Sequence, residues 1–201
     1  MIFDLGNVLL DFDHTLAAKR IASHCKKTPQ EIFNLFFDSK ITGLFEEGKV
    51  SPGGFFREVK KMLGLEMDYR DFLPIWNEIF FFTGENRAVY SLARSLKKCY
   101  KVALLSNVNT LHFDYIRGRF PIFDAFHHAV TSFETGARKP NPKIYQRTLE
   151  TLQVMPQEAF YTDDRPELIE EAIRLGIRAY VFKDSRKLKK DLRANGIRII
   201  R

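Results

Sequence analysis

The sequence predicts an α/β fold, a Rossmann-like parallel sheet core with an inserted all-helical cap. The runs at residues 102–106 and 159–162 are apolar and do not alternate with polar residues, as expected of strands buried on both faces. Helical patterns separate these runs, and strands that alternate with helices are typical of a parallel sheet. A long gap after the first strand predicts the insertion.

The individual elements follow from local signals. Ile2 and Phe3 lead into Asp4 as the first strand, and residues 129–131 and 179–182 are two further strands. Asn141-Pro142 supplies a cap and a first-turn proline and therefore opens a helix. Another helix follows Asp164 and ends at Gly176, and its periodicity points four side chains inward: Ile169, Ala172, Ile173 and Leu175.

The insertion is predicted to be helical throughout. A crossover between parallel strands needs only a dozen or so residues, but the second strand begins near Lys101. We therefore expect a core of residues 1–13 and 88–201 and a cap of residues 14–87. Thr28-Pro29 and Ser51-Pro52 open cap helices, and residues 69–81 form a third. Most of the cap phenylalanines should fill its small core, while Phe45 or the Phe80–Phe82 run could instead line a pocket.

Composition excludes several classes of protein. The chain has 201 residues, a formal net charge of +7 and two cysteines, Cys25 and Cys99, which form no CxxC pair. No apolar run approaches the length of a membrane span, and the first residues lack the pattern of a signal peptide. We expect a cytoplasmic protein, a monomer or weak homodimer, that binds neither membrane nor nucleic acid. The basic segment 183–193 is interpreted as the solvated face of a C-terminal helix.

Polar side chains follow the predicted strands where a ligand would bind. Ligands of open parallel sheets lie beyond the carboxyl ends of the strands, where the sequence places Asp4, Ser106-Asn107, Lys139 and Asp163-Asp164. Carboxylates crowded to ~4 Å would repel by about 4 kcal/mol per pair at an effective dielectric of about 20. A divalent cation relieves this repulsion, and oxygen ligands favour Mg²⁺. The cation and Lys139 could then hold a phosphate against a carboxylate nucleophile.

Four segments in this order resemble the motifs of the haloacid dehalogenase superfamily. They are Phe3-Asp4-Leu5-Gly6-Asn7-Val8-Leu9-Leu10-Asp11, Leu104-Leu105-Ser106-Asn107, Arg138-Lys139-Pro140 and Thr162-Asp163-Asp164. The resemblance covers essentially the whole chain, helical cap included. The Asp-Leu-Gly-Asn opening and the cap segment Glu46-Glu47-Gly48-Lys49-Val50-Ser51 are most similar to the bacterial α-D-glucose-1-phosphate phosphatase branch.

The resemblance implies a role for each matched position. Asp4 would be the nucleophile, Lys139 would stabilise it and the developing charge, and Ser106 with the Asn107 amide would bind the phosphoryl group. The implied Mg²⁺ ligands are Asp4, the Gly6 carbonyl, Asp164, and Asp163 directly or through water. Asn109 and His112 follow the second motif and could contact substrate or serve as capping residues. Glu46 and Arg165 could face the pocket, although a solvated acid and a charge-balancing cation are the simpler interpretations.

Two positions depart from the pattern. Most phosphatases of this superfamily carry an acid/base aspartate where this chain has Gly6, and relatives often carry Asn or Asp where it has Leu168. Without that acid, substrates with good leaving groups, such as glucose 1-phosphate, should be favoured. The sequence therefore predicts a Mg²⁺-dependent phosphatase of small phosphomonoesters acting through an aspartyl-phosphate. A 2-haloacid dehalogenase, which would not keep the Asp163-Asp164 pair, and a non-catalytic binding protein are the alternatives.

Overall fold

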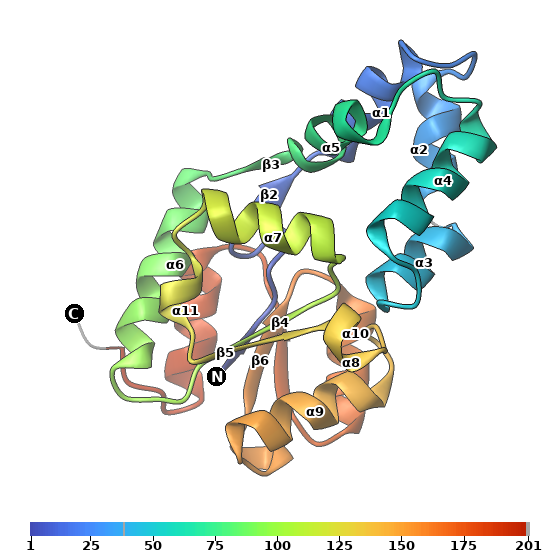
Figure 1. The fold of residues 1–201 in the computed structure, drawn as a ribbon. Helices are drawn as coiled ribbons and strands as arrows, with labels where there is room; N and C mark the ends of the chain where they lie inside the picture. The colour runs from blue at the N-terminus through green and yellow to red at the C-terminus, as the bar shows by residue number, and fades with distance from the viewer. Residues whose placement is uncertain (38, 200–201) are drawn as a thin grey trace.

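A five-stranded parallel sheet forms the centre of the molecule, in the order β5-β4-β1-β6-β7. The computed structural model describes residues 1–37 and 39–199. The first strand lies in the middle, so the ends of β1, β4 and β6 are neighbours. The sequence-predicted α/β architecture is confirmed (Figure 1). The strands are β1 (Ile2–Phe3), β4 (Ala103–Ser106), β5 (His128–Thr131), β6 (Phe160–Asp163) and β7 (Arg178–Val181).

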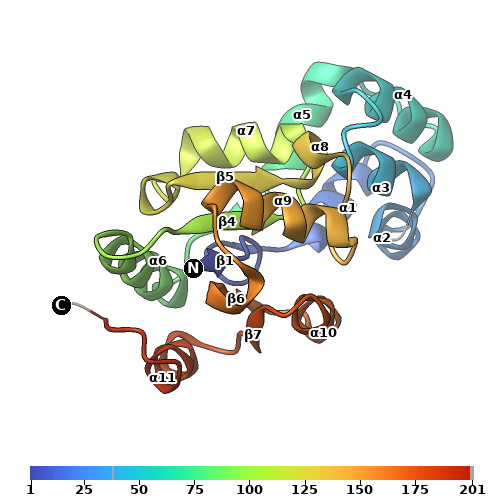
Figure 2. The same ribbon diagram turned by 90° about the horizontal axis from the view of Figure 1, so that it is seen from below.

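Helices cover both faces of this sheet, as Figure 2 shows. One apolar cluster joins the sheet to α6 (Gly84–Lys97), α7 (Thr110–Arg119) and α11 (Ser185–Ala194). A second cluster joins it to α9 (Pro142–Leu152) and α10 (Pro166–Arg174). The short α8 (Ser132–Thr135) follows β5. Asn141 caps α9 as predicted, but the inward orientation expected of Ile173 is wrong, because its side chain is 55% exposed.

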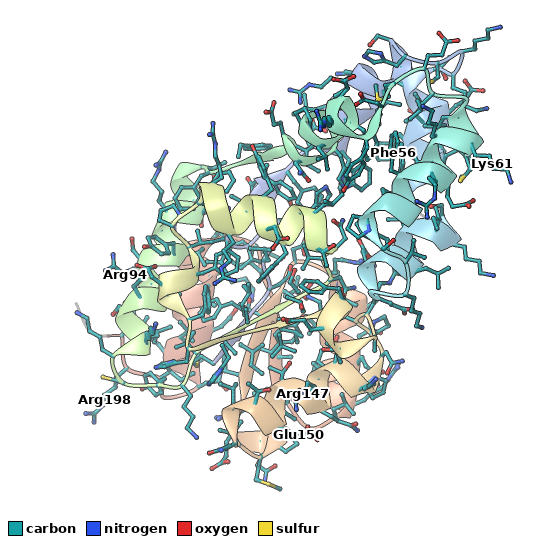
Figure 3. All side chains as sticks on the ribbon, in the orientation of Figure 1. Phe56, Lys61, Arg94, Arg147, Glu150 and Arg198 are labelled. Atoms are coloured by element: carbon teal, nitrogen blue, oxygen red, sulfur yellow. The ribbon has the colours of Figure 1, made fainter. Side chains whose placement is uncertain are left out.

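The cap is a separate helical unit with its own core. It comprises α1 (His14–Ala22), α2 (Pro29–Phe37), α3 (Lys40–Glu46), α4 (Pro52–Leu63) and α5 (Tyr69–Asn77). Both predicted helix starts are present, since Thr28 exchanges hydrogen bonds with Glu31 and Ser51 caps α4. Phe45 stacks on Phe55 with ring centroids 4.4 Å apart and is part of this core. Figure 3 shows Phe56 inside the cap and Lys61 on its outer side.

A two-stranded ribbon connects cap and core, and the sequence did not predict it. The helix expected over residues 69–81 ends at Asn77, and Phe80–Phe81 forms β3, antiparallel to β2 (Asp11–Phe12). Aromatic residues favour strands where a partner strand is available, and β2 supplies that partner. The expected boundary at residue 88 falls within α6, so we propose that the junction is this ribbon. Within the described residues, no helix is long and apolar enough to span a membrane.

Candidate active site

The polar residues predicted at the strand ends do meet at one edge of the sheet. Asp4 follows β1, Ser106 ends β4 and Asp163 ends β6. β1 pairs with both other strands, and the Asp4 amide donates to the Thr162 carbonyl across this pairing at 3.0 Å. Parallel register therefore gathers residues that lie more than a hundred positions apart in the chain.

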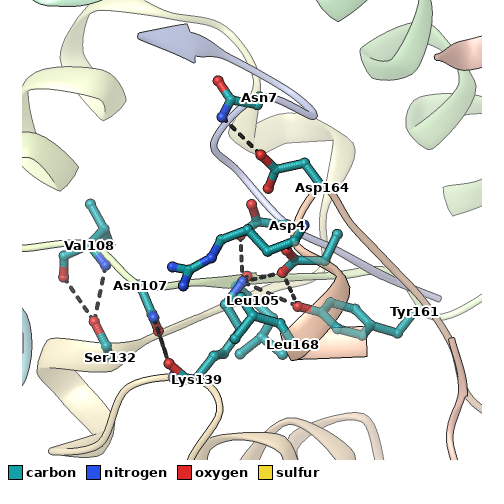
Figure 4. A network of polar contacts seen from close by, with 12 residues as sticks. Asp4, Asn7, Leu105, Asn107, Val108, Ser132, Lys139, Tyr161, Asp164 and Leu168 are labelled. Atoms are coloured by element: carbon teal, nitrogen blue, oxygen red, sulfur yellow. Dashed lines mark hydrogen bonds and ion pairs between the residues drawn. The ribbon is translucent and has the colours of Figure 1, made fainter. Parts of the chain in front are cut away.

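Lys139 is the centre of the cluster. Its Nζ donates to Asp4 Oδ1 and to Asp163 Oδ2, each at 2.6 Å, and to the Leu105 carbonyl at 3.1 Å. The side chain is 2% exposed, and Figure 4 shows it between Asp4 and Tyr161. A buried ammonium is stable only when it is paired, and here two carboxylates provide that pairing.

The proximity of these charges shifts their pKa values. Burial raises the pKa of Asp4 to about 7, and the negative charge of Asp163 adds to the shift, while Lys139 opposes it. Burial alone would lower the pKa of Lys139, but Asp4 and Asp163 raise it overall. The lysine is therefore a permanent cation, and Asp4 gains most from a further positive charge.

Three carboxylates are arranged as a cation site would require. Oxygen atoms of Asp4, Asp163 and Asp164 all lie within 4.8 Å of one another. Asp164 accepts a hydrogen bond from Asn7 Nδ2 at 2.9 Å, which fixes its carboxylate toward the loop after β1 (Figure 4). A set of close oxygen donors with excess negative charge fits a hard divalent cation such as Mg²⁺. Gly6, expected to add its carbonyl, lies in this same loop, which the Asn7 amide closes on the Leu10 carbonyl at 2.9 Å.

Asn107, in the second motif, fixes the backbone of Lys139 through two hydrogen bonds. The Asn107 side chain donates to the Lys139 carbonyl at 3.0 Å and accepts from the Lys139 amide at 2.7 Å. This pair of hydrogen bonds to the backbone N–H and C=O of Lys139 holds the start of the lysine side chain in place. Ser106 is buried at the end of β4, on the same edge of the sheet.

Asn109 and His112 form a buried pair rather than an open contact surface. Asn109 is the N-cap of α7, because its Oδ1 accepts from the His112 amide at 3.0 Å. The Asn109 amide nitrogen lies 3.1 Å from His112 Nδ1, and His112 Nε2 lies 3.1 Å from the Trp76 carbonyl in the cap. Burial lowers the pKa of His112 to about 4. The pair therefore links α7 of the core to α5 of the cap.

The Phe12 ring packs directly against Gly6. A Cβ added at Gly6 would lie 2.7 Å from Cε1 of Phe12, a distance that real side chains do not show. The Phe12 ring, part of β2, thus occupies the space that an aspartate at this position would enter. Without a shift of the Phe12 ring, a longer side chain at position 6 therefore does not fit.

The cap is closed over the site. Glu46, at the end of α3, accepts from Arg138 Nη1 at 2.9 Å, although it was expected to be solvated. Burial raises the pKa of Glu46 overall, although the positive charges of Arg138 and Arg165 oppose this shift. Gly48 has a φ of 67°, and a Cβ there would lie 2.4 Å from the Phe133 carbonyl oxygen. Only glycine permits this close approach of cap and core.

Two residues at the site were missed in the sequence. Asn7 has a left-handed φ of 54°, which asparagine tolerates better than most residues, and the sequence assigns it no role of its own at the site. Tyr161 was treated as part of an apolar strand. It lies two residues before Asp163, and residues i and i+2 of a strand share one face, so this spacing was the available signal. At position 168, where relatives often carry Asn or Asp, Leu168 is buried, and the preceding Glu167 pairs with Arg165.

A helical cap closed over a lysine-bridged carboxylate, at the carboxyl edge of a parallel sheet, defines a capped α/β enzyme. The model of the haloacid dehalogenase-like hydrolase family matches residues 1–182. The chain therefore belongs to the haloacid dehalogenase-like hydrolase family, which confirms the resemblance seen in its motifs.

Individual relatives match over most of their length. A D-ribitol-5-phosphate phosphatase of Bacteroides thetaiotaomicron is 25% identical over 90% of this chain and 89% of its own. A family enzyme of the same organism, solved with magnesium and inorganic phosphate, superposes with a TM-score of 0.80 at 26% identity, covering 90% of this chain and 92% of that one. An L-2-haloacid dehalogenase, 16% identical with a TM-score of 0.70 over 96% of this chain and 97% of its own, shares the fold.

Proposed function

We propose that the protein is a Mg²⁺-dependent phosphatase that hydrolyses small phosphomonoesters through an aspartyl-phosphate on Asp4. The observation that carries the proposal is the position of Lys139, 2.6 Å from both Asp4 and Asp163, with Asp164 alongside. A lysine in this position favours the ionised form of Asp4 and supplies positive charge where the phosphoryl group would bind. The relatives that act on phosphate esters support this interpretation.

Mg²⁺ would be held by Asp4 and Asp164 and, directly or through water, by Asp163, with the Gly6 carbonyl as an additional ligand. When bound, the ion would neutralise phosphoryl oxygens and orient the ester for in-line attack. Asn7 keeps the Asp164 carboxylate in place through its 2.9 Å hydrogen bond. The three carboxylates alone would repel a phosphate dianion, so activity is expected to require the cation.

Each residue of the chain has a distinct role in the proposed reaction. Asp4 Oδ1 is held by Lys139, which leaves Oδ2 to attack phosphorus. As this bond forms, the bond between phosphorus and the ester oxygen breaks, and the leaving alcohol takes its proton from water. Ser106 and the Asn107 amide bind phosphoryl oxygens, and Lys139 stabilises the charge that develops there. Asn109 contributes indirectly, because it caps α7 and contacts His112. Water then hydrolyses the acyl phosphate beneath the closed cap.

The ion pairs of Arg138 and Arg165 favour a substrate with a single phosphate and an uncharged remainder. Arg138 is paired with Glu46, and Arg165 is paired with Glu167. Each guanidinium that flanks the site is thus matched by a carboxylate, and a second anionic group would have to displace one of them. Sugar and polyol phosphates meet this requirement, and glucose 1-phosphate and D-ribitol 5-phosphate are the two compounds to compare.

Phosphate release from a panel of esters tests the proposal. The panel contains sugar phosphates, polyol phosphates, nucleotides and flavin mononucleotide, each assayed with Mg²⁺ and with EDTA, and 2-chloropropionate tests for halide release. Phosphate release that EDTA abolishes is expected. Halide release without phosphate release would instead establish a dehalogenase. If neither phosphate nor halide were released, the protein would be a binding protein.

A further inference from the structure

Tyr161 has a position that the proposed reaction does not yet use. Its hydroxyl donates to Asp163 Oδ2, the same oxygen that Lys139 contacts. It also lies 3.2 Å from Lys139 Nζ. The side chain is fully buried and its hydroxyl is a neutral donor among charged groups.

The hydrogen-bond inventory of Lys139 shows why this donor matters. An ammonium has three protons, but four oxygen atoms lie within reach of Nζ: those of Asp4, Asp163, Leu105 and Tyr161. The Tyr161 proton is directed to Asp163, whose other oxygen accepts from the Arg165 amide at 3.0 Å. Asp163 therefore receives two donors in addition to Lys139.

We propose that Tyr161 is a positioning residue that keeps the Lys139 ammonium in contact with both Asp163 and Asp4. The hydrogen bond from the Tyr161 hydroxyl partly satisfies the Asp163 carboxylate, which therefore attracts the Lys139 ammonium less strongly. Lys139 then remains as close to Asp4 as to Asp163. Without the hydroxyl, Asp163 draws Lys139 toward itself and away from Asp4 and the phosphoryl group. This inference rests on the proposed phosphatase reaction for its effect on rate, while the geometry of Lys139 can be tested independently.

A neighbouring tyrosine supplies a matched control. Tyr145 is also buried, and its ring meets that of Tyr161 edge to face at 5.8 Å. Its hydroxyl donates to the Leu168 carbonyl at 2.9 Å and not to the carboxylate cluster. Tyr145→Phe and Tyr161→Phe each remove one oxygen from the same part of the core, so a difference between them reports the contact with Asp163.

The first experiment measures kcat and KM of both variants on the best phosphate ester of the wild-type protein. For Tyr161→Phe we expect kcat to fall about tenfold with KM unchanged, the effect of one hydrogen bond to a charged group. Tyr145→Phe should retain kcat within about twofold. Equal kcat for the two variants would overturn the proposal. A rise in KM that accounts for the whole loss of kcat/KM in Tyr161→Phe would also overturn it.

Two further measurements test the contact between Tyr161 and Asp163 in the folded variants. In a double-mutant cycle, Tyr161→Phe should have no further effect on kcat in an Asp163→Asn background, because the hydroxyl acts through that carboxylate; a full additional loss would contradict this. The ammonium ¹⁵N resonance of Lys139 should shift in Tyr161→Phe and stay in place in Tyr145→Phe. An unmoved resonance would refute the positioning role even if the protein proved not to be a phosphatase.

Discussion

Replacing Lys139 by methionine should destabilise the metal-free protein in a pH-dependent manner. The Asp4 and Asp163 oxygens each lie 2.6 Å from Nζ and are thus within about 5 Å of each other. At an effective dielectric of about 20, two charges at that separation repel by about 3 kcal/mol. In other proteins, removing one partner of a buried ion pair lowers the unfolding free energy by roughly 3–5 kcal/mol, which is a similar magnitude. We expect Lys139→Met to lose about 3 kcal/mol of unfolding free energy at alkaline pH.

The sign of the pH dependence follows from linkage. The pKa of Asp4 is raised to about 7 in the folded protein, above its value in the unfolded chain. Such a group contributes stability that is present at low pH and is lost as pH rises through the folded pKa. Without Lys139 this pKa rises further. The variant should therefore be closest to wild-type stability near pH 5 and fall further below it through neutral pH.

Chemical unfolding in urea with EDTA, at acidic and alkaline pH, measures these differences. Lys187→Met is the control, because it removes a lysine from a surface pair with Asp191 that is worth under about 1 kcal/mol. Added Mg²⁺ should restore part of the stability of Lys139→Met by neutralising the carboxylates. If Lys139→Met were no less stable than Lys187→Met at alkaline pH, the argument from carboxylate repulsion would be refuted.

Three further predictions concern the cap and the leaving group. Gly48→Ala places a Cβ against the Phe133 carbonyl and should raise KM about tenfold by hindering closure; an unchanged KM would show that this contact does not limit closure. Glu46→Gln removes the ion pair with Arg138, which is partly exposed and worth about 0.5–1 kcal/mol. KM should therefore rise about threefold and no longer depend on salt concentration. A KM that still responds to salt as in the wild-type protein would argue against a role for this ion pair. Because Gly6 supplies no acid, kcat/KM for glucose 1-phosphate should exceed that for D-ribitol 5-phosphate by at least about tenfold, and equal values would mean that another group protonates the leaving oxygen.

The sequence predicted the architecture well because the strand and helix signals are local. The buried apolar runs and the capping residues Thr28, Ser51 and Asn141 each depend on near neighbours, and the structure contains the corresponding elements. The ribbon was missed because β3 depends on pairing with β2, about seventy residues earlier in the chain. The outward orientation of Ile173 also reflects tertiary packing that periodicity does not specify.

In the site, too, the features that depend on local signals could be predicted from the sequence, and those that depend on long-range contacts could not. The residues at strand ends could be predicted because parallel strands bring their carboxyl ends to one edge. The contacts of Tyr161 and Asn7 with that cluster, and the Phe12 ring beside Gly6, arise from side chains meeting across distant segments. Motifs located the reactive groups, whereas the groups that position them became visible only in three dimensions.

Acid-quenched mass spectrometry tests the central claim most directly. The protein is mixed with Mg²⁺ and its best phosphate ester, stopped in acid during turnover and digested. The account predicts a phosphoryl adduct on the peptide that contains Asp4, and its absence, together with loss of turnover, in a folded Asp4→Asn variant. Turnover that persists in that variant, or an adduct on a different residue, would contradict the assignment of Asp4 as the nucleophile.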